Sequence, residues 1–135
     1  VITDLASRFI YFPSTDIGGK NGGVVISSYV WATEAALWDA LTDESRVEYT
    51  LNDMAKIFGE EIRNYFIVGS SQSWGNDVYS TGEAAMLTPG QFEELEGYLQ
   101  MPDRNIHFGG DATSFKIAWI EGAIEAGIRT ALEIN

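Results

Sequence analysis

The chain has 135 residues, of which 45% are apolar, 13% are aromatic and 21% are charged. This composition is typical of one modest, ordered domain and argues against intrinsic disorder. The formal net charge of −12 argues against binding to nucleic acid or to an anionic membrane, since both surfaces would repel the protein. Without cysteine there are no disulfides or thiolate chemistry, and the compartment stays open. The single histidine, His107, offers little for a histidine-based metal site, and no metal is predicted.

Two β-prone runs open the chain and predict a wide hairpin. Residues 8–12 stop at a proline, and residues 24–31 resume extended structure after a glycine-rich segment. Alternation along the second run puts Tyr29 and Trp31 on one face, so a phenol and an indole should lie side by side. Cross-strand packing and ligand contact both stay open for this pair. The glycine-rich run 18–23 lies between two strands, which fits a hairpin loop better than a phosphate cradle.

The middle of the chain is predicted to be mainly helical scaffold. Residues 33–59 are expected to form two helices capped by Thr33 and Thr42, the second with an acidic first turn. Residues 65–68 are predicted to form a strand. Thr88 and Pro89 are predicted to open a short helix over residues 90–99, with Thr88 as its cap and Gln91, three residues on, as the partner in a capping box.

Residues 105–135 combine a short β-prone run, a glycine pair and an amphipathic helix. Ile106–Phe108 form the run, Gly109 and Gly110 interrupt it, and the helix follows a polar turn. A strand–turn–helix unit of this kind can bring a ligand close to the N–H groups at the helix start, which suits an anionic or carbonyl-bearing ligand. Small residues along the helix indicate close packing against another backbone or a flat ligand.

These segments carry a family resemblance. Residues 110–123, GDATSFKIAWIEGA, resemble the C-terminal flavin-contacting segment of flavin amine oxidases, and more narrowly of L-amino-acid oxidases of the L-glutamate oxidase type. The runs RFIYFP and GGVVISSYVW resemble the matching segment of L-amino-acid oxidases, and the spacing W-x-x-D-x-Y-x-x-G from Trp74 recurs in flavin amine oxidases. The chain has no GxGxxG turn for a dinucleotide pyrophosphate, so it would carry half of a cofactor site.

The resemblance implies a mixed α/β (α+β) fold from the C-terminal part of a two-domain FAD-dependent enzyme. Residues 1–100 would form a β-rich part of the substrate-binding domain, and residues 101–135 would close the FAD-binding domain with a βα unit. The implied reaction is oxidative deamination of an L-amino acid to a 2-oxo acid, ammonia and hydrogen peroxide, with FAD as cofactor. The implied partners are the N-terminal part of the same enzyme, the amino acid and O2, in a homo-oligomer of the assembled enzyme. The start at Val1 predicts a processed or excised piece of a longer protein.

The same resemblance implies two groups of site residues and assigns no catalytic residue. Tyr29 would donate its hydroxyl to the substrate α-carboxylate, and Glu83 would face the ammonium group. The implied substrate-binding residues are Tyr29, Trp31, Glu83, Ala84 and Trp119. The implied cofactor-binding residues are Trp74, Gly110, Asp111, Ala118, Trp119, Ile120 and Ala123.

Three other interpretations stay open. An amine or polyamine oxidase would share the flavin segment, although an amine without a carboxylate needs no donor at Tyr29. An amino-acid monooxygenase that releases an amide would share the whole scaffold. Composition alone also allows a non-catalytic acidic binding module whose aromatic residues form a core.

Overall fold

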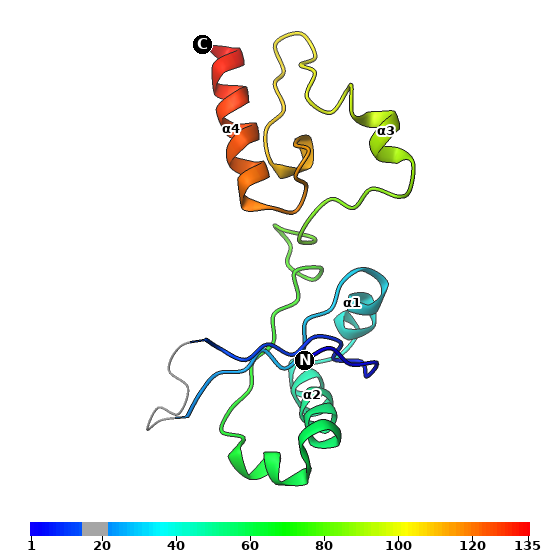
Figure 1. Cartoon of the computed structure of the whole chain (residues 1–135), viewed down its shortest axis with the longest axis vertical. Helices are drawn as coiled ribbons and strands as arrows, with labels where there is room; N and C mark the ends of the chain where they lie inside the picture. Colours follow the sequence, from blue (N-terminus) through cyan, green and yellow to red (C-terminus); the bar gives the residue numbers. More distant parts are fainter. Residues whose placement is uncertain (15–21) are drawn as a thin grey trace. The chain divides into compact units, whose positions relative to one another are not determined.

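A computed structural model describes residues 1–14 and 22–135. The chain divides into two compact units, Val1–Thr81 and Gly82–Asn135 (Figure 1). Most of the predicted glycine-rich hairpin loop, residues 18–21, lies outside the described residues. The predicted domain boundary after residue 100 concerns the architecture of a longer enzyme, and it stays a prediction.

The described part of the first unit contains three helical segments. They are α1 (Ala32–Asp39), α2 (Asp43–Phe58) and the 3₁₀ segment η1 (Glu60–Tyr65). The predicted cap at Thr42 is confirmed, because its side chain accepts a hydrogen bond from the N–H of Ser45 at 3.2 Å. The predicted cap at Thr33 is wrong. The helix begins one residue earlier, and Trp31 occupies the N-cap position without a side-chain cap.

The two N-terminal runs meet at isolated β-bridges. Tyr11 and Ile26 exchange both backbone hydrogen bonds, at 2.9 and 3.0 Å, in an antiparallel bridge. Arg8 also pairs with Tyr29, but in a parallel bridge, which a hairpin does not form. The predicted hairpin pairing is therefore confirmed only between Tyr11 and Ile26, and neither run becomes a continuous strand.

The β-rich expectation is not confirmed. The described residues are mainly helices and loops, with bridges in place of strands. The strand predicted at 65–68 is instead the end of η1 and an exposed loop. The strand predicted at 106–108 is reduced to one bridge, between Asp103 and Ile106. A strand becomes stable when a neighbour pairs its backbone groups, and the described residues provide only the one bridge at Ile106 for these two runs.

The N-terminal segment is attached to α2 by a buried polar contact. The Asp53 carboxylate is 5% exposed and accepts hydrogen bonds from the Ser7 N–H at 3.1 Å and from its hydroxyl at 2.9 Å. Lys56 contributes a third bond at 3.1 Å, so the buried charge is well satisfied. Around this contact lie the buried apolar residues of the unit, Ile10, Met54 and Ala55.

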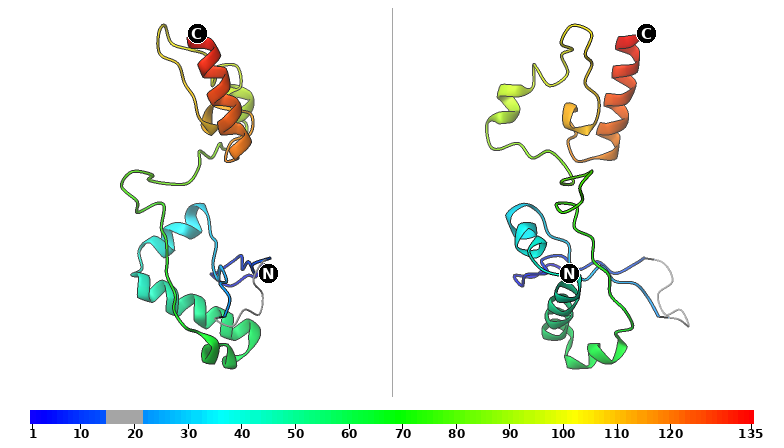
Figure 2. Two further views of the ribbon diagram at one scale, coloured as in Figure 1. Left: turned by 90° about the vertical axis from the view of Figure 1, so that its left-hand side faces the viewer. Right: turned by 180° about the vertical axis from the view of Figure 1, so that it is seen from behind.

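The second unit is a long loop that lies along one helix. Its helical segments are α3 (Gln91–Leu95), η2 (Asp111–Thr113) and α4 (Ile120–Ile134). Two further views show the loop that contains η2 beside α4 (Figure 2). The helix predicted at 90–99 is shorter than expected, and its predicted cap at Thr88 is wrong, because Gly90 is the N-cap and provides no side-chain cap. The Thr88 N–H still donates to the Gln91 side chain at 2.8 Å. Among the described residues, no helix has the length and apolarity that a membrane span requires.

Candidate functional site

Four aromatic rings from the N-terminal runs form a cluster in which each ring contacts two of the others. Phe9 stacks with Tyr11 and Trp31, with ring centroids 6.4 and 6.3 Å apart. Tyr29 meets the same two rings edge to face, at 6.0 and 5.6 Å. The predicted side-by-side placement of Tyr29 and Trp31 is thus confirmed. Trp31 is 54% exposed and Tyr29 is half-buried, so the cluster is a surface that can present rings to a ligand rather than a closed core.

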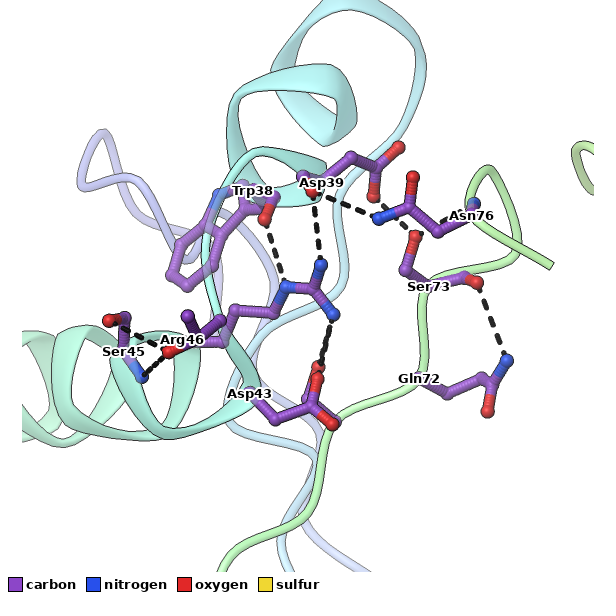
Figure 3. A network of polar contacts seen from close by, with 10 residues as sticks. Trp38, Asp39, Asp43, Ser45, Arg46, Gln72, Ser73 and Asn76 are labelled. Atoms are coloured by element: carbon purple, nitrogen blue, oxygen red, sulfur yellow. Dashed lines mark hydrogen bonds and ion pairs between the residues drawn. The ribbon is translucent and has the colours of Figure 1, made fainter.

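The loop that carries Trp74 is attached to the corner between α1 and α2 (Figure 3). Arg46 lies at the centre of this corner, with a side chain that is 11% exposed. Its guanidinium donates to the carbonyl oxygens of Trp38 (2.9 Å) and Asp39 (3.3 Å), the carboxylate of Asp43 (3.0 Å) and the hydroxyl of Ser71 (3.1 Å). One planar cation therefore joins three chain segments.

Asp39 continues the network into the loop. Its carboxylate accepts a hydrogen bond from the Ser73 hydroxyl at 2.5 Å, and its carbonyl oxygen accepts one from the Asn76 side chain at 2.9 Å. A Cβ added at Gly75 would lie 2.5 Å from the Asp39 carboxylate, so a larger residue here would displace that side chain from its present contacts. The backbone around Trp74 is fixed in this way, while its ring is 52% exposed and open to a ligand.

We expect Arg46→Ala to destabilise the first unit by about 2 kcal/mol, because partly buried acceptors lose their donor. Arg63→Ala is the matched control. Arg63 also bonds several acceptors, but its partners Glu60 and Glu48 are 79% and 63% exposed, and solvent can replace it. Thermal unfolding of the whole enzyme measures both variants. Equal losses of stability would contradict the central role of Arg46.

An open pocket of about 700 Å³ lies within the second unit. The loop 85–87 forms one wall, and residues 115–119 form another. Phe92 and Phe115 meet edge to face within the lining, with centroids 6.2 Å apart. The predicted residues Ala118 and Trp119 both line the pocket. Its walls are largely apolar, and Lys116 and Glu121 add charge at the start of α4.

The glycine turn leads to the start of α4. Gly110 has φ of 115°, in the region that favours glycine, and a Cβ added there would meet no heavy atom within 4 Å. The next residue, Asp111, accepts a hydrogen bond from the Ala118 N–H at 2.9 Å, so two predicted cofactor residues are bonded to each other. Ala118 has φ of 68°, an uncommon conformation that this bond supports.

The groups at this helix start can be compared with the chemistry of a flavin. Trp119 is the N-cap and provides no side-chain cap, so the first N–H groups of α4 are left to bond a ligand. Asp111 and Glu121 place negative charge beside them, which favours a neutral carbonyl oxygen over a phosphate. The Asp111 carboxylate can accept a hydrogen bond from a hydroxyl group. Carbonyl oxygens and hydroxyls are both part of FAD, so these residues fit a portion of that cofactor.

The remaining predicted residues lie on the same unit. Glu83 is exposed and Ala84 is partly exposed, directly before the pocket wall that begins at Ala85. Ile120 opens α4 and is 77% exposed. Ala123 lies one turn later, and its N–H donates to the Trp119 carbonyl oxygen at 3.2 Å. Among the described residues, no group of His, Cys, Asp and Glu side chains is arranged to hold a metal ion.

A polar cluster at the far end of α4 was not predicted from the sequence. Glu133 accepts a hydrogen bond from Arg129 at 2.6 Å and lies 3.0 Å from the Nδ1 of His107. Arg129 and Glu133 are four residues apart, so their pairing on one helix face could have been predicted. The link to His107 spans 26 residues, and no local pattern indicates it.

The cluster also predicts an acid sensitivity. The contacts with His107 first, and Arg129 second, hold the pKa of Glu133 below its ordinary value. A carboxyl group with a lowered folded pKa stabilises the fold above its unfolded pKa of about 4.3, and this contribution disappears as pH falls through the folded value. We expect Glu133→Gln to flatten the fall in unfolding free energy below about pH 5. Denaturant titrations across pH check this, and identical slopes for both proteins would refute it.

The chain matches a known protein family over almost its whole length. It belongs to the family described as flavin containing amine oxidoreductase, which matches residues 2–135. A putative L-amino-acid oxidase, YobN, from Bacillus subtilis is 43% identical over 134 residues, which cover 99% of this chain and 28% of that protein. An L-glutamate oxidase precursor from Streptomyces viridosporus is 44% identical over 135 residues, which cover 99% of this chain and 20% of the precursor.

An animal relative extends the comparison. An L-amino-acid oxidase from the fish Siganus canaliculatus is 38% identical over 135 residues, covering 99% of this chain and 26% of that protein. The chain thus spans only about a fifth to somewhat more than a quarter of the length of these relatives. The family membership predicted from the glycine turn and the aromatic motifs is confirmed.

Proposed function

We propose that this chain is the C-terminal part of a flavin-dependent L-amino-acid oxidase. The enzyme converts an L-amino acid, O2 and water to a 2-oxo acid, ammonia and hydrogen peroxide. The observation that carries the proposal is the match of almost the whole chain to proteins named L-amino-acid oxidase or L-glutamate oxidase. The selectivity of the enzyme for one amino acid side chain over another depends also on residues outside this piece.

The cofactor-binding role is assigned to the second unit and to the Trp74 loop. The flavin, when bound, supplies the two-electron redox chemistry of the reaction. The start of α4 at Ile120 offers N–H groups to a flavin carbonyl oxygen, and Asp111 accepts from a hydroxyl. Gly110 leaves room for the ligand to approach the backbone. Ala118, Trp119 and Ala123 complete the contact surface on the same helix start, and Trp74 packs near the ring system.

The substrate-binding role is assigned to the aromatic cluster and to the pocket lining. Tyr29 donates its hydroxyl to the α-carboxylate, and its ring is held by the edge contact with Trp31. Trp31 narrows the space for the substrate side chain. In the second unit, Trp119 and Ala84 form walls beside the substrate, and the Glu83 carboxylate faces the ammonium group. These residues bind and orient the amino acid and exclude water from it.

The rest of the same enzyme is the main partner of this chain. The outward face of α4 carries Ile120, Ile124, Ile128 and Leu132, each more than half exposed. A continuous apolar face of this kind is normally buried against another element. The remaining length of the relatives supplies chain to cover it. In that assembly, residues 1–100 belong to the β-rich substrate-binding domain and residues 101–135 close the FAD-binding domain.

A peroxide assay of the whole enzyme across the twenty L-amino acids tests the function. We expect peroxide with one or a few L-amino acids, and none with amines that carry the same side chains but no carboxylate. Peroxide from the amines alone would identify an amine oxidase. An amide product without stoichiometric peroxide would identify a monooxygenase. A colourless protein that is inactive with every substrate would favour the acidic binding module.

A further inference from the structure

Arg129 connects the glycine turn to the last helix. From one face of α4, its guanidinium donates through Nη2 to the Phe108 carbonyl oxygen at 2.8 Å and to the Thr113 hydroxyl at 3.3 Å. Nη1 donates to the Gln100 carbonyl oxygen at 3.2 Å and to Glu133. Phe108 and Thr113 flank the turn that contains Gly110 and Asp111, so one side chain holds the turn on both sides.

Neighbouring contacts strengthen this attachment. The Thr130 hydroxyl lies between two carbonyl oxygens, 2.8 Å from that of Ala126 and 3.0 Å from that of Phe108, and shares its one proton between them. A Cβ at Gly109 would lie only 3.1 Å from that hydroxyl. Within the turn, the Thr113 hydroxyl donates to the Gly110 carbonyl oxygen at 2.9 Å. The turn is therefore packed against α4 directly before Asp111.

Glu133 aligns the guanidinium from the other side. Its carboxylate bonds Arg129 through one oxygen and lies near His107 through the other, so it joins the helix to the residue before Phe108. The Arg129 side chain is 22% exposed, and its Nε is buried without a partner among the described residues. The guanidinium thus leaves one donor unsatisfied while its two terminal nitrogens reach the loop. This geometry indicates that the contacts with the turn, and not a surface ion pair, define its position.

We propose that Arg129, aligned by Glu133, is the positioning residue of the flavin-facing turn formed by Gly109, Gly110 and Asp111. The inference rests on the proposed function, because it assigns a purpose to a turn that contacts FAD. In this proposal Arg129 acts through the turn and not through a contact of its own with the cofactor. Its planar guanidinium bonds two separate carbonyl oxygens and a hydroxyl. A lysine side chain carries all its donors on one nitrogen and cannot reproduce this pattern.

The test uses the whole enzyme and two readouts. The first is the dissociation constant of FAD, measured by adding FAD to the flavin-free protein. The second is hydrogen exchange of backbone amides 108–114 in the flavin-free protein. We expect Arg129→Gln to weaken FAD binding by about tenfold or more and to speed exchange in this segment. Arg129→Lys keeps the charge but loses the planar guanidinium. It should therefore recover less than half of the FAD affinity that Arg129→Gln loses, measured on a logarithmic scale. Arg104→Gln, at an exposed arginine of the same unit, should change neither readout.

Two results would overturn the proposal. An Arg129→Gln enzyme that binds FAD within twofold of the unaltered protein, with unchanged exchange at 108–114, would show that the turn is held without Arg129. Full rescue of both readouts by Arg129→Lys would show that only the charge matters. If Arg129→Gln does not fold, the same two measurements are made on Arg129→Lys. FAD affinity and hydrogen exchange equal to those of the unaltered enzyme would then refute the proposal. If the unaltered enzyme binds no flavin, the proposed function fails, while hydrogen exchange still tests whether Arg129 holds the turn.

Discussion

Tyr29→Phe raises the Michaelis constant of the assembled enzyme for its amino acid much more than it lowers turnover. A hydrogen bond to a charged group contributes about 1.5–3 kcal/mol, so kcat/KM should fall roughly ten- to a hundredfold. Phenylalanine keeps the ring that meets Tyr11 and Trp31 edge to face, so the aromatic cluster should remain intact. Steady-state kinetics of peroxide release measure the effect.

Tyr11→Phe is the matched control for this variant. It also loses one phenolic hydroxyl from the same four-ring cluster, at a position that has no assigned contact with substrate. We expect its KM and kcat to stay close to those of the unaltered enzyme. Unchanged kinetics for Tyr29→Phe, or equal effects of the two variants, would refute the assignment of the carboxylate to Tyr29.

Gly122→Ala should disrupt the start of α4 and reduce flavin binding with it. An added Cβ would lie 2.2 Å from the Lys116 carbonyl oxygen and 2.4 Å from the Ser114 hydroxyl oxygen. The first neighbour is backbone, so the loop 114–119 must move rather than a flexible side chain. Overpacking of this kind costs about 1–3 kcal/mol. The displaced loop contains Ala118 and Trp119, so flavin affinity should fall together with the melting temperature.

Gly97→Ala serves as the comparison for Gly122→Ala. It adds the same methyl group in the same unit, where no heavy atom lies within 4 Å of the new Cβ. Its melting temperature and flavin content should stay within experimental error of the unaltered enzyme. A Gly122→Ala enzyme with normal stability and normal flavin content would contradict the close approach of the loop to α4.

Local sequence signals predicted the presence of the helices better than their ends, and they predicted the strands poorly. The cap at Thr42 and the amphipathic helix after the glycine pair both depend on neighbours within a few residues, and both are present in the structure. The runs at 65–68 and 106–108 have β-prone residues, but a strand also needs a partner from elsewhere in the chain. The described residues provide only a single bridge beside the second run.

The candidate site shows the same division. Alternation along one run was enough to predict that Tyr29 and Trp31 lie together. The corner around Arg46 and the attachment of the turn by Arg129 were not predicted, because their contacts join residues that are 25 and 21 positions apart. Single arginines give no local signal of such contacts. The family resemblance supplied the roles of the flavin and substrate residues, which spacing alone could not define.

The visible absorption spectrum of the whole native enzyme, recorded without oxygen before and after an L-amino acid is added, tests directly whether this chain belongs to an L-amino-acid oxidase. We expect a flavin band that is lost with the L-amino acid and persists with its D-enantiomer. Admission of oxygen should restore the band and release hydrogen peroxide. A protein without a flavin band, or a band that no L-amino acid changes, would contradict the assignment of this chain to an L-amino-acid oxidase.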